Sequence, residues 1–150
     1  MHRYRGATGL AFLVLTAILS FGCGNDTPTS PTTTTDTTTT TATPTVTETF
    51  SATVPVGGAK FYSFTVEQNG TVNLTLTSVS GSFVPSTVML GLGVGTPDAT
   101  DCTTTSTVNT ASGSTAQLTA TLAPGVYCAR VYDVGNLFAP ADVNVQVDHP

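Results

Sequence analysis

The chain has 150 residues, enough for one domain plus accessory segments, and a formal net charge of −5 from four basic and nine acidic side chains. Arg3 and Arg5 stand near the N-terminus, so the rest of the chain has only Lys60 and Arg130 as basic residues against all nine acidic ones. Two cations cannot neutralise a row of phosphates, which excludes nucleic acid as a partner and leaves little attraction to anionic lipid headgroups.

Residues 1–22 have the layout of an export signal. Basic side chains open the segment, and an apolar stretch runs from residue 10 to residue 21. This stretch is too short to cross a hydrocarbon layer, which needs roughly 20 residues. It suits the apolar core of a secretory signal peptide, so we expect residues 1–22 to direct the protein out of the cytoplasm.

The apolar stretch ends in Leu19-Ser20-Phe21-Gly22-Cys23. This sequence resembles the lipobox of bacterial lipoproteins, in which a small residue precedes a cysteine that receives diacylglycerol before cleavage. The leucine usual three places before that cysteine is replaced here by Ser20. The resemblance implies that Cys23 is lipidated, with membrane lipid as its partner, and Gly24 after it favours the outer membrane. The alternative is an ordinary signal peptide, or an uncleaved anchor, with an incidental cysteine.

Residues 23–45 are predicted to be a disordered tether. From Thr27 to Thr47, 14 of 21 residues are Thr, and prolines interrupt the run. The segment shows no apolar periodicity, so nothing in it offsets the entropy lost on ordering. Fully stretched, 21 residues reach roughly 70 Å.

Residues 46–150 are predicted to form one domain, because apolar and polar residues alternate there with the period of β-strands. The expected strands are separated by Gly-, Pro- and Asn-containing turns. They occupy residues 46–54, 62–66, 72–76, 88–94, 118–122, 127–131 and 143–147. A long polar loop is expected over residues 95–113. This pattern predicts an all-β fold, an antiparallel β-sandwich of about seven to eight strands, with Tyr62, Phe64 and Tyr127 in its core.

Three stretches share a pattern with a known family: the run Phe61-Tyr62-Ser63-Phe64-Thr65-Val66, the strand at residues 70–76, and the later Pro124-Gly125-Val126-Tyr127-Cys128-Ala129-Arg130-Val131-Tyr132. Together they resemble the bacterial pre-peptidase C-terminal domain. The resemblance covers about residues 46–148 and takes residues 142–147 as the closing strand. It implies a jelly-roll-like sandwich that accompanies secreted proteases and other exported enzymes. In such proteins the domain aids secretion or substrate binding.

Cys102 and Cys128 are the two cysteines that remain once Cys23 is assigned to lipid. An exported chain enters an oxidising compartment, where an even pair is most simply a disulfide. The alternatives are two free thiols, or a catalytic or metal-binding pair, for which other soft ligands are lacking.

Catalytic groups are scarce in the predicted domain. His149 is the only histidine after the signal, and it lies beside the last residue, where chain ends are usually loose. No serine has an evident base to activate it. Asp133 and Asp142 could in principle act as a glycosidase pair, although solvated turn residues are the simpler interpretation. For Arg130 we expect a salt bridge to a nearby aspartate, with a ligand contact as the alternative.

Calcium is a further possibility for the acidic loops. Asp98, Asp101 and Asp133 are the candidate ligands, since loop carboxylates suit that ion. No EF-hand or repeat signature accompanies them, and no cofactor is otherwise expected.

The sequence therefore predicts a lipid-anchored cell-envelope protein whose monomeric, non-catalytic β-sandwich binds an extracellular polysaccharide or protein, or serves as surface structure. The alternative is an accessory module that supports the secretion, stability or targeting of an exported peptidase or other hydrolase.

Overall fold

The structure, a computed structural model, describes residues 40–150. Cys23 and most of the expected tether lie outside these residues. The described part contains eight strands and no helix, and therefore no helix that could span a membrane. The strands are β1 (Val46–Val54), β2 (Ala59–Val66), β3 (Gly70–Ser80), β4 (Leu90–Pro97), β5 (Cys102–Thr110), β6 (Leu118–Leu122), β7 (Gly125–Asp133) and β8 (Ala141–His149).

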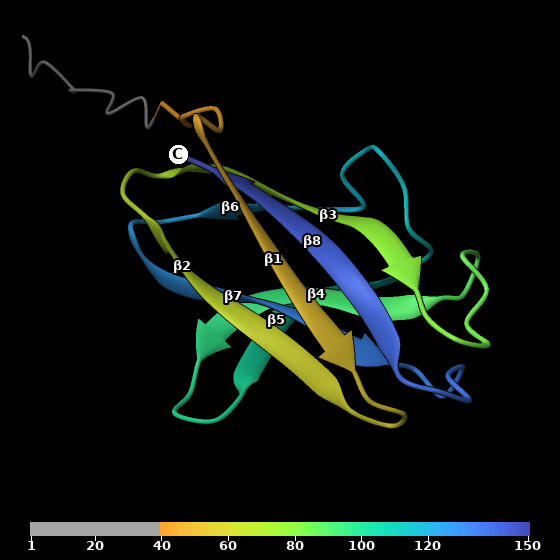
Figure 1. Cartoon of the computed structure of the whole chain (residues 1–150). Helices are drawn as coiled ribbons and strands as arrows, with labels where there is room; N and C mark the ends of the chain where they lie inside the picture. The colour runs from red at the N-terminus through yellow and green to blue at the C-terminus, as the bar shows by residue number, and fades with distance from the viewer. Residues whose placement is uncertain (1–39) are drawn as a thin grey trace, which may run out of the picture. The chain divides into compact units, whose positions relative to one another are not determined.

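The strands form two four-stranded antiparallel sheets that pack face to face (Figure 1). One sheet has the order β1-β8-β3-β6 and the other the order β2-β7-β4-β5. Apart from the β4–β5 hairpin, each strand is followed by a strand of the opposite sheet, which is the arrangement of a jelly roll. The predicted all-β antiparallel sandwich is therefore confirmed. The eight strands of the described residues enclose one core, and this part of the chain is a compact unit of its own.

The core lies between the sheets and uses the apolar side of each alternating strand. In β8, Val143, Val145 and Val147 are at most 2% exposed, while the residues between them lie on the outer face. Burying such side chains is the main stabilising contribution to the fold. Phe64 is 3% exposed, as predicted. The two tyrosines that we also expected in the core, Tyr62 and Tyr127, are half-buried and pack against its edge.

The prediction of a loop over residues 95–113 is wrong for most of that range. β4 continues to Pro97, and residues 102–110 form β5, which pairs with β4 along its whole length. β5 is an edge strand made of Thr and Ser, with Val108 as its half-buried apolar residue. Such a strand shows no apolar alternation, so periodicity cannot reveal it, although its β-branched threonines favour strand geometry.

Glycines on the outer side of β4 let other groups approach that strand closely. The Tyr132 ring covers Gly91, where an added Cβ would lie 2.1 Å from the ring. At Gly95 an added Cβ would lie 1.9 Å from the Thr103 carbonyl oxygen, because the β5 main chain runs against the glycine. The register of β4 with β5 shifts at this point.

The chain enters the sandwich beside its last strand. The main-chain amide of Ala42 donates to the Asn69 carbonyl at 2.9 Å, and that of Thr45 donates to the His149 carbonyl at 3.0 Å. Residues that we expected in the tether therefore contact the domain. The entering chain and the end of β8 share one end of the sandwich, and the β3–β4 and β7–β8 loops lie at the other (Figure 1).

Candidate functional site

The candidate lipidation residue, Cys23, lies outside the described residues. Its modification stays a prediction from the sequence.

The predicted disulfide between Cys102 and Cys128 is confirmed. The two sulfur atoms are bonded, and the Cα atoms are 5.9 Å apart. Cys102 opens β5 and Cys128 lies in β7, the two strands that flank β4, and both are buried. The bridge therefore joins two strands, because Cys102, which falls within the loop expected over residues 95–113, lies in β5.

Arg130 lies on the outer face of the same sheet and forms the expected ion pair. Its Nε atom is 3.5 Å from the Asp101 carboxylate, and the guanidinium carbon is 5.4 Å from the centre of the Tyr132 ring. Within residues 40–150 this buried nitrogen has no hydrogen-bond partner. The contact is a charge interaction, supported by the aromatic ring beneath it.

Asp133 is a structural residue of the turn after β7. Burial would raise the pKa of this carboxyl, but hydrogen bonds from four main-chain amides outweigh that effect and lower it. The donors, at 2.8 to 3.2 Å from the carboxylate oxygens, are the amides of Gly57, Gly135, Asn136 and Leu137. This carboxylate ties the β7–β8 loop to the β1–β2 turn.

The three candidate calcium ligands do not come together. Asp98 and Asp101 lie in the β4–β5 turn, whereas Asp133 pairs with Leu90 at the opposite end of β4. Within residues 40–150 no group of three or more His, Cys, Asp or Glu side chains could hold a metal ion.

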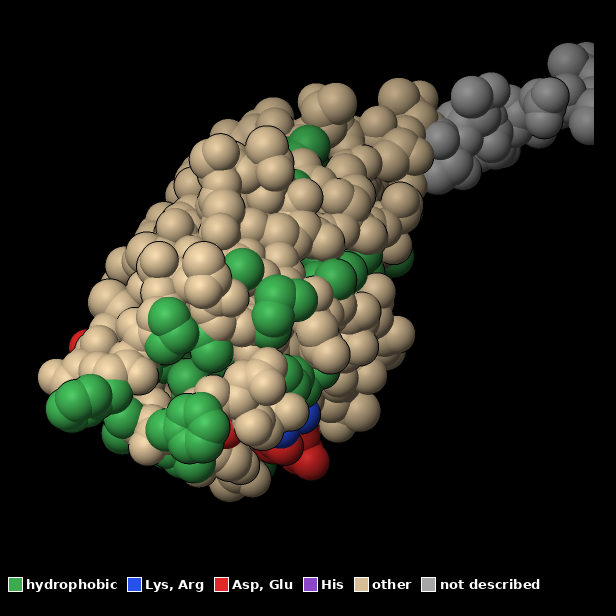
Figure 2. All heavy atoms as spheres, turned by 90° about the vertical axis from the view of Figure 1, so that its right-hand side faces the viewer, with side chains coloured by type: hydrophobic (Ala, Val, Ile, Leu, Met, Phe, Trp, Pro, Cys, Tyr) green, Lys and Arg blue, Asp and Glu red, His purple; other side chains and the backbone are tan. Residues whose placement is uncertain are grey.

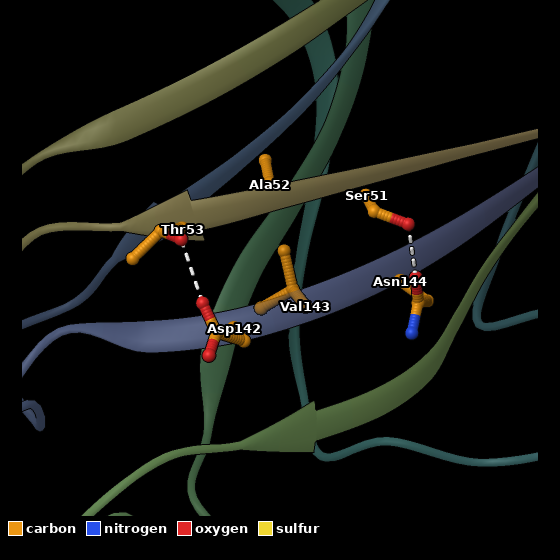
Figure 3. A pocket seen from close by; sticks show the side chains of 6 residues that line it. All are labelled: Ser51, Ala52, Thr53, Asp142, Val143 and Asn144. Carbon is orange, nitrogen blue, oxygen red and sulfur yellow. Dashed lines mark hydrogen bonds between the residues drawn. The ribbon is translucent and has the colours of Figure 1, made fainter.

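Asp142 lies on the other sheet from Asp133, so the two carboxylates do not form a pair on one surface. It accepts a 2.6 Å hydrogen bond from the Thr53 hydroxyl across the β1–β8 pair. In Figure 3 Ser51 contacts Asn144 in the same way, while Ala52 and Val143 point to the other side of the sheet. These six residues line a shallow hollow of about 290 Å³ on the outer surface.

A second pocket, of about 310 Å³, lies at the end of the sandwich where the chain enters. Its polar lining comes from β1, the end of β2 and the end of β8. The residues are Thr45, Val46, Glu48, Thr65, Glu67, Gln68, His149 and Pro150. We refer to it as the entry pocket.

His149, expected at a loose chain end, is instead buried in the wall of the entry pocket. It is 4% exposed, and its ring lies 5.4 Å from the Phe64 ring. Nε2 is 3.0 Å from a Glu48 carboxylate oxygen, and Nδ1 is 3.3 Å from the main-chain oxygen of Pro150. The register of β1 with β8, which sets Val46 opposite His149, holds this end in place.

Glu48 joins His149 to Tyr62. The Tyr62 hydroxyl donates to the second Glu48 carboxylate oxygen. This bond lowers the pKa of Glu48 against the opposing effect of burial, with His149 adding to the lowering, and it raises the pKa of Tyr62. Each ring nitrogen of His149 thus faces an oxygen, Nε2 that of Glu48 and Nδ1 that of Pro150.

This cluster is built to hold strands together, because each polar atom in it already has a partner. Both ring nitrogens of His149 are engaged in these contacts within the domain. A sequence signal for the cluster existed, since Glu48 occupies the apolar register of β1 between Val46 and Phe50. A carboxylate there needs a partner when it is buried.

The comparisons with known proteins agree with this architecture. The family model described as "Bacterial pre-peptidase C-terminal domain" matches residues 58–133. A search of curated proteins found no match to the chain. The match spans β2 to β7, so β1 and β8, which we expected to be part of the resemblance, lie outside it. With half of its length matched, the chain belongs to the bacterial pre-peptidase C-terminal domain family.

Proposed function

We propose that this protein is a lipid-anchored protein of the bacterial cell envelope. It displays a non-catalytic pre-peptidase C-terminal domain that serves in binding or as surface structure. Family membership and the lipobox-like sequence ending at Cys23 support the proposal. The outer membrane is the proposed location, on the basis of Gly24.

One observation carries the non-catalytic part of the proposal, namely the engagement of His149. It is the only histidine after the signal, and the structure uses both of its ring nitrogens in contacts with Glu48 and Pro150. A hydrolase that relies on an activated serine or threonine needs a free base beside it. The two aspartates considered for glycoside hydrolysis, Asp133 and Asp142, lie on different sheets and accept structural hydrogen bonds.

The outer face of the β1–β8 pair is the surface that best suits a polar ligand such as an extracellular polysaccharide or a protein. On this face, hydroxyl groups of β1 donate to carboxyl or amide oxygens of β8 in three cross-strand pairs. The hollow in Figure 3 lies on this face.

The family name favours a second candidate function. A domain of this family could assist an exported peptidase or other hydrolase in secretion, stability or targeting, without a ligand of its own.

Anchoring is tested by intact-mass analysis of the full chain produced in a bacterium that makes lipoproteins. We expect a mature protein that begins at Cys23 and has the mass of attached acyl chains, and an unprocessed precursor for Cys23→Ala. A wild-type protein that starts elsewhere, or lacks acyl mass, would contradict the proposed anchor.

The binding role is tested by glycan and peptide arrays probed with residues 40–150, together with a screen of ester, peptide and glycoside substrates. We expect retention of a ligand and no turnover. Reproducible turnover that disappears in Asp142→Asn, at unchanged melting temperature, would show an enzyme instead. Empty arrays would favour the accessory function.

A further inference from the structure

Two phenylalanine side chains are displayed at the end of the sandwich remote from Ala42. Phe83, in the β3–β4 loop, is 93% exposed, and Phe138, in the β7–β8 loop, is 94% exposed. The loops lie side by side, since the Asn136 side-chain amide donates to the Met89 carbonyl at 3.1 Å. Met89 is 40% exposed. We refer to Phe83, Met89 and Phe138 as the apolar tip. Figure 2 views this side of the domain and shows hydrophobic side chains gathered in the lower half of the picture.

Folding does not account for the display of these rings. Neither phenylalanine contributes buried area to the core. Phe83 also has a φ of 67°, a left-handed conformation that is unfavourable for a residue with a bulky side chain. A strained backbone that presents a fully solvated ring points to a contact made outside the domain.

We propose that the apolar tip inserts into the surface of a lipid bilayer with zwitterionic or uncharged headgroups. The β3–β4 loop, residues 81–89, and the β7–β8 loop, residues 134–140, contain no charged side chain, so entering the bilayer surface would not desolvate a charge on either loop. Phenylalanine is among the side chains that proteins bury at the boundary between headgroups and acyl chains.

The size of the tip favours lipid over a stable protein partner or a second copy of the chain. Two phenyl rings offer roughly 300–500 Å², because an aromatic side chain buries about 150–250 Å². A stable protein interface needs about 800 Å² from each partner. A fluid lipid layer sets no such minimum, because it closes around each inserted ring.

Charge decides the class of lipid. Residues 40–150 contain two basic and seven acidic side chains, a net charge of −5. Anionic headgroups would repel this domain, whereas zwitterionic headgroups would not.

The chain is long enough for the tip to reach the membrane that holds it. Thr40 follows Cys23 by seventeen positions, which span at most about 60 Å. A nine-residue strand such as β1, which runs the length of the sandwich, spans about 30 Å. This step rests on the proposed anchor at Cys23, but insertion itself does not, so the test below uses residues 40–150 alone and the two proposals can fail separately.

Tryptophan fluorescence gives a direct test, because the chain contains no Trp. Phe83→Trp and Phe138→Trp each place a single fluorophore at the tip of residues 40–150. Val126→Trp is the matched control, since Val126 is 55% exposed but lies on β7 opposite Thr65, at the other end of the sandwich. Each variant is titrated with phosphatidylcholine vesicles, with and without brominated acyl chains, and with vesicles containing phosphatidylserine.

We expect a blue shift and bromine quenching for the two tip variants on phosphatidylcholine, weaker binding when phosphatidylserine is added, and no change for Val126→Trp. In a vesicle-flotation assay, replacing one phenylalanine by serine should weaken partitioning by about tenfold or more, and the double variant should not float. The double variant should keep the melting temperature of the wild type, because both rings are exposed.

Absence of quenching in both tip variants would overturn the proposal, as would equal quenching of Val126→Trp. A blue shift without vesicles, accompanied by dimer formation in sedimentation velocity, would assign the tip to a second copy of the chain and overturn the proposal as well.

Discussion

Phe64 is the residue at which the core of the sandwich meets the entry pocket. Its ring centre lies 6.3 Å from that of Tyr127 and 5.4 Å from that of His149, and the side chain is 3% exposed. Truncating this side chain removes buried apolar area and leaves a cavity between the two sheets.

We therefore predict that Phe64→Ala lowers the free energy of unfolding by about 3–5 kcal/mol, a large part of the stability of a domain of this size. Urea denaturation followed by circular dichroism measures the loss. Phe138→Ala serves as the control, and it should change the stability by less than about 0.5 kcal/mol because the ring is exposed. Similar effects of the two substitutions would show that Phe64 is not a core residue.

Glu48 makes the stability of the domain depend on pH. Its pKa is lowered from the ordinary value of 4.5, chiefly by the Tyr62 hydroxyl. A lowered pKa means that folding favours the carboxylate, so this contribution is present above the ordinary value. It is lost as the pH falls through the lowered one.

Glu48→Gln should therefore reduce stability at pH 7, where the wild type has the carboxylate, and the difference between the two proteins should shrink in acid. Urea midpoints at pH 7 and at pH 3 measure this. A difference that stays constant or grows toward low pH would contradict the assignment of the Glu48 carboxylate as a stabilising group.

At the scale of the strands, β5 depends on two features of its neighbours. The bridge to Cys128 fixes its first residue, and the absence of a side chain at Gly95 leaves room for its main chain. Neither feature relies on apolar burial, which this strand of Thr and Ser largely lacks.

Replacing both bridged cysteines by serine should lower the free energy of unfolding by up to about 3.5 kcal/mol, the chain-entropy value for a closed loop of this length. Urea denaturation of the double variant, compared with the wild type before and after reduction, measures it. Peptide mapping without reducing agent should find the two cysteine peptides joined in the wild type. Free alkylation of both thiols in the native, oxidised domain would disprove the bridge.

Gly95→Ala should both destabilise the domain, by about 1–3 kcal/mol or more, and leave part of the protein with free thiols. The physical reason is the 1.9 Å approach of the new Cβ to the Thr103 carbonyl, which forces β5 away from β4. Thiol titration and thermal melting measure the two effects. Gly125→Ala is the control, since a Cβ there would meet the Tyr127 ring at an ordinary 3.4 Å. Equal behaviour of the two variants would contradict the close approach at Gly95.

The sequence predicted those strands whose apolar residues alternate, and the sandwich follows from them. It did not predict β5, because an edge strand stabilised by pairing and a disulfide needs no apolar face. The cysteine pair was predictable by elimination, whereas the contact of Glu48 with His149 was not. That contact joins residues 101 positions apart and depends on the register of β1 with β8, which alternation alone does not determine. The exposure of Phe83 and Phe138 likewise depends on loop conformation, which follows no simple period.

At the scale of the whole domain, the two ends of the sandwich differ in chemistry. The end where the chain enters is polar and holds the entry pocket, with Glu48, Glu67 and His149 in its lining. The other end presents the apolar tip on two loops without charge. The distance between them is set by the length of the strands, so a contact at one end leaves the other free.

The position of β1 determines how the domain responds to mechanical force. β1 is an edge strand, paired with β8 from Val46 opposite His149 to Val54 opposite Ala141. A pull on the entering chain that is resisted at the β3–β4 loop acts along the strand, so the interstrand hydrogen bonds, which lie across it, are sheared together. A pull resisted at Pro150 acts on both strands at the same end and separates the bonds one after another. Force spectroscopy with handles at residues 40 and 86 should therefore give a higher unfolding force than handles at residues 40 and 150. A domain held at its apolar tip would resist tension, whereas a domain held at Pro150, beside its entering chain, would unzip at a lower force.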